Sequence, residues 1–329
     1  MLLITPLITE LERLYKGAEI DIIAEGDIGK EVFSTFFSVK NIYCLPKRGF
    51  KHPWSFLRLL SKVRKTRYDL IVDPCIGSGF SRALTRALNG TYKLGFDDKW
   101  AGSGLTHAVP EDAALRHMAH RPVNLVRWVP SPEHVDDQQY PMLDIRLTDV
   151  ELAQGRQVIH ELLDVPTETS MPLVVGIFGN ATRAKRYPSE WWREFLDTFR
   201  AQCPQARLIE VVPMHGHSMF GAEWPGYYST DIRRMGAVMA GMDLMITADC
   251  GVMHLAVASK VPTVGMFSVT DATVYEPYGM GSCALVTKGL TAQEVASRIV
   301  ANYAQLLEHK APAGVPWQNP PTLEQQVRM

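Results

Sequence analysis

The stretch from Leu244 to Phe267 constrains the fold of this chain more than any other segment. It begins with an apolar run over 244–248 that is too short for a helix, turns at 249–251, and continues through an apolar helical segment into a second apolar run over 261–267. This order predicts strand, tight turn, helix and strand. In a parallel α/β sheet the helix of such a unit begins at the carboxyl end of its strand. Its unpaired N–H groups and positive dipole end therefore face the crevice where ligands of open α/β sheets bind.

The turn itself carries the first candidate site residues, Asp249, Cys250, Gly251 and His254. Asp249 is suited to accept hydrogen bonds from ligand hydroxyls, and Gly251 lets a phosphate approach the backbone. A simpler interpretation is also open, because Asp is among the best helix N-cap residues. His254 on its own is more often a half-buried helix residue, and its position beside Asp249 and Gly251 is what favours a role in the site.

Composition and charge narrow the class of protein. The chain has 329 residues, enough for two domains, and 34 Lys or Arg against 35 Asp or Glu, which argues against a protein that coats nucleic acid. Five scattered cysteines favour reduced thiols. We expect no metal, because the pair His215 and His217 has no third ligand at suitable spacing. There is no apolar run long enough to cross a bilayer and no basic signal-peptide start, so we expect a cytoplasmic protein.

Two series of alternating strands and helices divide the chain into an N-terminal α/β domain over 1–164 and a C-terminal one over 173–309. Between them, residues 165–172 are the best linker candidate by composition, and residues 310–329 form a proline-rich tail. Alternation of this kind predicts parallel sheets, and two such domains facing a central cleft suit a transfer between two substrates.

A basic loop follows the first strand of the C-terminal domain. It runs from Asn180 to Pro188 and includes Thr182, Arg183, Lys185 and Arg186. Three positive charges between a strand end and a helix start are typical of a loop that neutralises phosphates, although a solvated basic loop is the common alternative. We expect Lys185 to reach a diphosphate, with Asn180 and Thr182 donating hydrogen bonds to the same group.

A weaker motif follows the predicted strand over 69–73. Gly77 and Gly79 precede Arg82, and Asp97 and Asp98 lie near the position of a ribose-binding acid in dinucleotide-binding folds. Arg82 stands where the third glycine of that motif is needed for helix–strand packing. We therefore favour a loop that presents Arg82 to an anionic substrate over an NAD site.

The turn and the strand after it resemble the signature of glycosyltransferase family 9, the lipopolysaccharide heptosyltransferases. That signature is an Asp-Ser/Thr-Gly-x-x-His-Leu-Ala turn, then a proline-containing strand and a loop ending in Thr-Asp, matched here over 249–256, 261–267 and 270–271. The resemblance covers most of the chain. It extends to residues 68–73, 94–96, Lys185 with Pro188, and 278–279.

The resemblance implies a GT-B fold of two Rossmann-like domains and an inverting, metal-independent transfer without cofactor. The donor is a nucleotide-diphosphate sugar, typically ADP-heptose, held mainly by the C-terminal domain, and the acceptor is of the lipopolysaccharide-core type at the inner membrane surface. It assigns Asp249, Gly251 and His254 to the donor, with Cys250 in the same turn. Lys185 would stabilise the leaving diphosphate, and Arg82 is our candidate for the acceptor.

The chain departs from this family pattern in three places. Family members usually begin with a strand and a turn ending in Gly-Asp, whose aspartate is the base for the acceptor hydroxyl, and this sequence starts just after that point. Cys250 occupies the position where the family has Ser or Thr. Ser268-Val269 occupies the position of its Gly-Pro pair. We expect a translation start upstream of Met1 that supplies the missing strand and base. The alternative is a nucleotide-sugar-binding relative without transfer activity.

Overall fold

The structure of the chain, a computed structural model, describes residues 1–46, 53–99, 104–111, 115–128, 139–167 and 169–308. They form two compact units. Unit 1 comprises Met1 and Leu3–Pro141, and unit 2 comprises Leu2 and the chain from Met142 onward. No helix among the described residues has the length and apolar character needed to cross a bilayer.

Unit 1 contains two parallel sheets. Strands β1 and β2 form one sheet, and β3, β4 and β5 form the other in that order. A buried cluster that includes Leu7, Leu94, Phe96 and Leu125 joins helices α1 and α5 to β4. The elements are α1 (Thr5–Leu14), β1 (Ile20–Glu25), α2 (Ile28–Phe33), β2 (Val39–Leu45), α3 (Pro53–Val63), β3 (Tyr68–Asp73), α4 (Gly79–Ala87), β4 (Gly90–Asp97), β5 (His107–Pro110) and α5 (His120–Trp128).

Unit 2 contains one six-stranded parallel sheet with the order β11-β10-β9-β6-β7-β8. The elements are α6 (Asp149–Leu163), β6 (Val174–Phe178), the 3-10 turn η5 (Arg183–Lys185), α7 (Ser189–Gln202), β7 (Arg207–Val211), β8 (Gly226–Tyr227), α8 (Ile232–Met239), β9 (Leu244–Ala248), α9 (Gly251–Ala258), β10 (Thr263–Phe267), α10 (Ala272–Tyr275), β11 (Cys283–Val286), α11 (Ala292–Asn302) and α12 (Ala304–Glu308).

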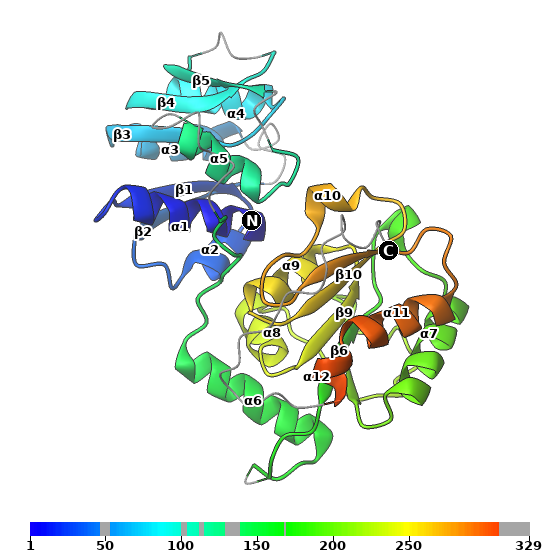
Figure 1. The fold of residues 1–329 in the computed structure, drawn as a ribbon. Coiled ribbons are helices and arrows are strands. Elements are labelled where there is room, and N and C mark those ends of the chain that lie inside the picture. Colours follow the sequence, from blue (N-terminus) through cyan, green and yellow to red (C-terminus); the bar gives the residue numbers. More distant parts are fainter. Residues whose placement is uncertain (47–52, 100–103, 112–114, 129–138, 168, 309–329) are drawn as a thin grey trace. The chain divides into compact units, whose positions relative to one another are not determined.

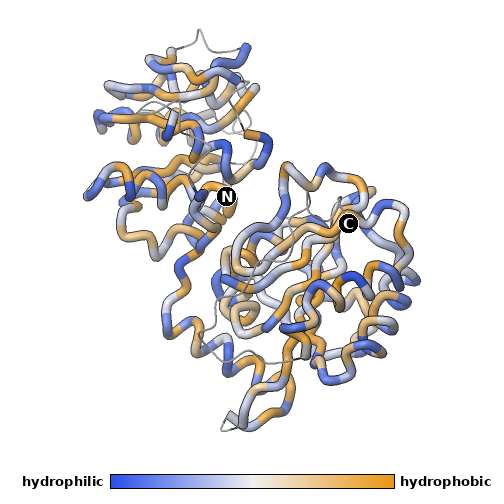
Figure 2. The backbone as a smooth tube through the Cα atoms, viewed as in Figure 1, coloured by the Kyte–Doolittle hydropathy of each residue, from blue (hydrophilic) through white to orange (hydrophobic). Residues whose placement is uncertain are grey.

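The central strands of this sheet are buried along their whole length. β6, β9 and β10 have every residue buried, as expected for parallel strands covered on both faces. Helices α7 and α11 lie on one face and α8 and α9 on the other (Figure 1), and the strands between them are predominantly hydrophobic (Figure 2). The largest cluster joins side chains of α7 and α11 to the sheet and includes Phe195, Phe199 and Ile299.

The strand order places a topological switch between β6 and β9. From β6 the chain first builds outward through β7 and β8, and then returns to the other side of β6 to add β9, β10 and β11. The loops after β6 and β9 therefore leave the sheet in diverging directions. In open α/β sheets the crevice at this point, outside the carboxyl ends of the strands, is where ligands bind.

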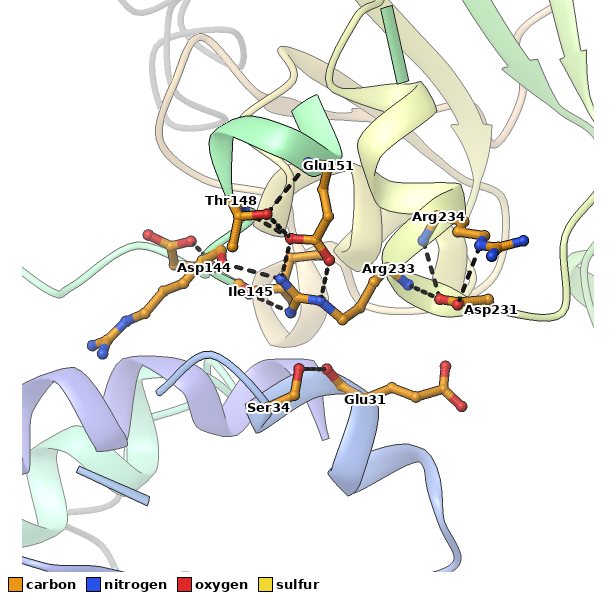
Figure 3. A network of polar contacts seen from close by, with 10 residues as sticks. Glu31, Ser34, Asp144, Ile145, Thr148, Glu151, Asp231, Arg233 and Arg234 are labelled. Carbon is orange, nitrogen blue, oxygen red and sulfur yellow. Dashed lines mark hydrogen bonds and ion pairs between the residues drawn. The ribbon is translucent and has the colours of Figure 1, made fainter. Parts of the chain in front are cut away.

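Helix α6 belongs to unit 2, although the sequence predicted a boundary after residue 164. The Arg233 guanidinium of α8 pairs with the Glu151 carboxylate at 2.6 Å and donates to the Ile145 carbonyl at 2.8 Å (Figure 3). The hydrogen bond from Arg233 lowers the pKa of Glu151 to about 2. A Cβ at Gly155 would lie 2.0 Å from the Ala237 carbonyl oxygen, so the two helix backbones are in close contact. The compact units divide between Pro141 and Met142.

The strands expected over 69–73, 244–248 and 261–267 are present as β3, β9 and β10, with ends that differ by at most two residues. Six elements were not predicted from the sequence, and most of them are short: α2, α5, α10, β5, β8 and β11. Burial against neighbours, rather than local periodicity, stabilises elements of this length. The predicted linker over 165–172 carries no helix or strand among its described residues, and the predicted tail over 310–329 lies outside the described residues.

Candidate functional site

An ion pair between Lys185 and Asp249 lies at the switch point of unit 2. Lys185 ends the 3-10 turn after β6, and Asp249 directly follows β9, the neighbour of β6 in the sheet. The Lys185 Nζ lies 2.7 Å from Oδ2 of Asp249. The fold therefore brings together the two charged residues that the sequence singled out in separate segments.

Asp249 is buried but has unused capacity to accept hydrogen bonds. Its side chain is 6% exposed, while that of Lys185 is 31% exposed, so the pair reaches solvent through the lysine. Oδ2 of Asp249 has no hydrogen-bond partner of suitable geometry, and its contact with Lys185 is an ion pair rather than a directed hydrogen bond. A buried carboxylate oxygen in this state is costly unless a donor reaches it, which favours a ligand hydroxyl at this position.

The N-terminus of α9 is open next to this pair. Cys250, not Asp249, is the N-cap residue of the helix, and its side chain makes no standard capping hydrogen bond. Burial raises the pKa of the Cys250 thiol, against the lowering effect of the Thr247 hydroxyl and of the Met253 and Val252 N–H groups near its sulfur. A protonated thiol is a weak acceptor for such N–H groups. Gly251 is exposed, and a Cβ there would meet no atom within 4 Å. Backbone donors and free space coincide at this helix end.

His254 lies one turn into α9 and is 9% exposed. Its ring lies 6.4 Å from that of Tyr275, the last residue of α10. Tyr275 also lies under the Lys185 ammonium, with 5.8 Å between Nζ and the ring centroid. The sequence did not identify Tyr275 as a site residue. The only sequence signal for Tyr275 is its position, four residues after the Thr270-Asp271 loop.

Asn180 and Thr182 lie on the same loop as Lys185. Asn180 is half-buried and Thr182 is exposed, and the Thr182 carbonyl accepts from the Lys185 N–H at 3.2 Å. Between them and the lysine, Arg183 adopts a left-handed backbone with φ of 52°. Strained backbone in a non-glycine residue is concentrated at functional sites, because the surrounding structure must stabilise it. The loop is held in a defined shape that presents Lys185 to Asp249.

Tyr187 connects the end of this loop to the segment that follows β11. Its hydroxyl shares a 2.6 Å hydrogen bond with Thr287, whose own hydroxyl donates to the Phe267 carbonyl at the end of β10. Burial raises the pKa of Tyr187, so the phenol stays neutral. The sequence did not predict this anchor, because Tyr187 and Thr287 are far apart in the chain and neither belongs to a motif.

Arg82 occupies a different environment from the one expected of an acceptor-binding residue. It is 1% exposed, pairs with Asp73 at 3.0 Å and with Asp98 at 3.5 Å, and donates to the Phe96 carbonyl. Asp98 also accepts from the Gly77 N–H at 2.6 Å. The residues of the weak glycine motif thus bind one another inside unit 1, where a dinucleotide would need them free.

His215 and His217 lie together in the loop between β7 and β8. Their rings stack at 5.7 Å, and the backbone N–H of His217 donates to Nδ1 of His215. In the described part of the chain no three His, Cys, Asp or Glu side chains are grouped so that they could hold a metal ion. The same described residues include all five cysteines, and none of them forms a disulfide.

A parallel sheet of reversing strand order, with charged side chains and an open helix N-terminus at its switch point, defines the class of doubly wound α/β proteins that bind anionic ligands. A family model described as glycosyltransferase family 9 (heptosyltransferase) matches residues 56–299. The chain belongs to this family and is a glycosyltransferase of the lipopolysaccharide heptosyltransferase kind.

Solved structures of similar fold agree with this membership. A family 9 glycosyltransferase from Veillonella parvula has a TM-score of 0.76 at 15% identity, with 93% of each chain covered. Heptosyltransferase II from E. coli, described as an ADP-heptose enzyme, has a TM-score of 0.72 at 17% identity over 94% of this chain and 96% of its own. E. coli WaaC bound to ADP-2-deoxy-2-fluoro heptose has a TM-score of 0.66 at 18% identity over 92% and 95%. The fold is of the GT-B type. No curated protein matches the chain.

Proposed function

We propose that the chain transfers a heptose from ADP-heptose to a lipopolysaccharide-core-type acceptor, with inversion at the anomeric carbon and without a metal ion. The observation that carries this proposal is the Lys185–Asp249 pair at the switch point of unit 2, beside the open N-terminus of α9. The family and the E. coli enzyme with bound ADP-2-deoxy-2-fluoro heptose support the choice of donor. Such an enzyme would act at the cytoplasmic face of the inner membrane, in peripheral contact with it.

In this proposal each residue of the site has a separate task. The acceptor hydroxyl oxygen attacks the anomeric carbon, and the bond to the diphosphate oxygen breaks with its electrons leaving on the nucleotide. Lys185 and the α9 N–H groups stabilise the negative charge that develops on that diphosphate. Asp249 accepts hydrogen bonds from sugar hydroxyls, while Lys185 stays paired with its Oδ2.

In this proposal the remaining predicted residues also contact the donor. Gly251 leaves room for a phosphate against the backbone, with Cys250 beside it, and His254 lies where it can donate to the donor sugar or diphosphate. Asn180 and Thr182 supply further donors from the loop. The proton of the acceptor hydroxyl needs a base within hydrogen-bond reach, and we assign that role to no residue of this chain. Because Arg82 is enclosed in its own network, we do not place it at the acceptor.

The test separates the two partners of the pair. Lys185→Ala should lower turnover with ADP-heptose about 100- to 1,000-fold, the usual effect of removing a preorganised stabiliser of developing charge. Asp249→Asn should weaken ADP-heptose binding at least about tenfold and leave ADP binding nearly unchanged, because its partner is the sugar. Release of ADP in the presence of acceptor measures turnover, and calorimetry with ADP and ADP-heptose measures binding. Arg193→Ala, which removes a charge from an exposed position of α7, is the control and should change neither quantity.

Unchanged ADP-heptose binding in both site variants would refute this donor site. If the unaltered chain binds ADP-heptose and releases no ADP in the presence of acceptor, the chain is a binding relative without transfer activity. Turnover that is lost with a chelator and restored by a divalent metal would contradict the metal-free mechanism.

A further inference from the structure

Unit 1 carries a concentration of positive charge at one end of its β3-β4-β5 sheet. This is the end opposite Asp73, the last residue of β3. Residues 58–93 include eight Lys or Arg and only two Asp. One of the two, Asp73, is buried against Arg82 and does not offset charge at the surface. The chain as a whole has a formal net charge of -1, so this excess is local.

Four of these cations converge on one cavity. A hollow of about 550 Å³ at the amino-terminal ends of β3 and β4 is lined by Arg64, Arg67, Arg86 and Lys93, together with Asn89 and a short stretch of backbone. No carboxylate lines it. Arg64 follows α3, Arg86 lies in the last turn of α4 and Lys93 lies on β4, so three separate elements direct positive side chains to the same place.

Contacts at the base of the side chains hold this arrangement. The Asn89 amide donates to the Arg64 carbonyl at 2.6 Å, which ties the end of α3 to the turn before β4. Lys93 donates through Nζ to the Arg86 carbonyl at 3.0 Å, and the stem of Arg86 packs against Gly104. Burial lowers the pKa of Lys93.

The helix dipole accounts for only part of this cluster. Positive side chains near the C-termini of α3 and α4 stabilise those helices, which explains Arg64 and Arg86. Arg67 and Lys93 lie outside both helices. None of the four forms an ion pair with another residue in the ranges that the structure describes, whereas Arg82 and Arg127 of the same unit are paired with buried carboxylates.

We propose that this cavity binds a phosphate group. Guanidinium forks bind phosphate oxygens in pairs, and an ammonium held near them adds a point charge, which is the recurrent chemistry of phosphate sites. The site lies within unit 1 and is separate from the Lys185–Asp249 site of unit 2. It does not depend on the proposed transfer reaction. The phosphate comes either from the headgroup of an anionic lipid or from a free soluble anion.

The experiment uses the full chain at low ionic strength, where screening is weak. One arm titrates inorganic phosphate by calorimetry. The other measures cosedimentation with vesicles of equal parts phosphatidylglycerol and phosphatidylcholine, and with vesicles of phosphatidylcholine alone. The double variant Arg64→Gln with Arg86→Gln is compared with Arg156→Gln with Arg298→Gln, which removes the same charge from exposed positions of unit 2.

In each arm where the unaltered chain binds, we expect the variant changed at Arg64 and Arg86 to bind at least about tenfold more weakly. The variant changed in unit 2 should alter binding less than about twofold. Binding to phosphatidylglycerol vesicles alone identifies a lipid headgroup, and binding in both arms identifies the phosphate group itself. The double change to Lys, which keeps the charge, should restore part of the affinity and shows that folding is not the cause.

Two outcomes would overturn the proposal. The first is no binding in either arm. The second is an equal loss in both double variants, which would mean that net charge, and not this cavity, attracts the anion.

Discussion

Each unit has an aspartate at the carboxyl end of a parallel strand, and each aspartate forms an ion pair with a cation from another segment. The two pairs differ in how many hydrogen bonds the carboxylate accepts. In unit 1, Asp73 is surrounded by Arg82, the Ser81 hydroxyl, the Thr85 hydroxyl and the Cys75 N–H. Both charged side chains are 1% exposed. In unit 2, Oδ2 of Asp249 lies 2.7 Å from the Lys185 ammonium, and this buried oxygen has no hydrogen bond of suitable geometry.

The difference separates a structural ion pair from a candidate site. Burial of a charge is tolerated when the carboxylate is well supplied with donors, as Asp73 is, although Nε of its partner Arg82 has no hydrogen bond. A carboxylate with an unfilled oxygen, an exposed partner and an open helix end is stable only at a cost, and a ligand relieves that cost. The charges are alike in the two pairs, so the number of hydrogen bonds to the carboxylate and the exposure of the cation are what distinguish them.

The largest expected effect is on stability, from breaking the saturated pair. Arg82→Met leaves the Asp73 carboxylate buried without its cation, which should cost about 3–5 kcal/mol of unfolding free energy. Lys185→Met should cost about 1 kcal/mol, because that side chain is partly exposed and water reaches the site. Urea unfolding followed by circular dichroism gives both values. Equal losses would show that Lys185–Asp249 is another structural pair.

A second saturated carboxylate in unit 1 predicts acid sensitivity. Glu10 is fully buried; burial acts to raise its pKa, but hydrogen bonds from Arg127 and Arg13 outweigh this and lower it to about 2. The stabilisation is therefore complete above the unfolded value of 4.5 and is lost as the pH falls from there toward 2. Its size is on the order of 3 kcal/mol.

Urea unfolding measured between pH 6 and pH 2.5 checks this loss of stability. The interval lies within the range in which carboxyl groups ordinarily titrate, about 2 to 6. Glu10→Gln should be much less stable than the unaltered chain at the upper end and similar to it at the lower end. Glu19→Gln, at an exposed carboxylate paired with Lys40 at 3.7 Å, is the control and should follow the unaltered chain throughout. A constant difference between the Glu10 variant and the unaltered chain would contradict the assignment.

The smallest expected effect is at the helix cap beside Asp249. Cys250→Ser replaces a buried, protonated thiol with a better N-cap acceptor, which should stabilise α9 by about 0.5–1 kcal/mol. Hydrogen exchange of the α9 backbone reports the change locally. Cys44→Ser in β2, where no cap is involved, should give no gain. A loss of stability at Cys250 would show that the thiol contributes packing and not capping.

Local patterns were sufficient to predict much of the fold. The runs that became β6, β9 and β10 are apolar and short, and each is followed by a turn and a helix start, so the parallel α/β class and the family could be inferred without coordinates. Lys185 and Asp249 were identified individually for the same reason. Tyr275 and Thr287 were not, because a half-buried tyrosine or a buried threonine has no distinctive local pattern.

Long-range packing decided the points on which sequence and structure differ. The helix over 149–163 was assigned to the first half by its position in the chain, and its contacts with α8 place it in the second. Arg82 was assigned to a ligand because it stands in a glycine-bearing turn, and burial against Asp73 gave it an internal partner. Neither burial nor partner identity is encoded in residue spacing.

The sequence by itself determined the class of fold, the family and the chemistry available after each strand, because periodicity, turn residues and charged side chains are local properties. Only the tertiary structure decided which of these charges meet. Strand order brings β9 beside β6 and so joins Lys185 to Asp249, while Arg82 is enclosed and four cations of unit 1 converge on one cavity. The physical reason is that pairing and desolvation depend on how distant segments pack, and the same charged residue is a ligand-binding group or a structural one according to whether that packing fills its hydrogen bonds.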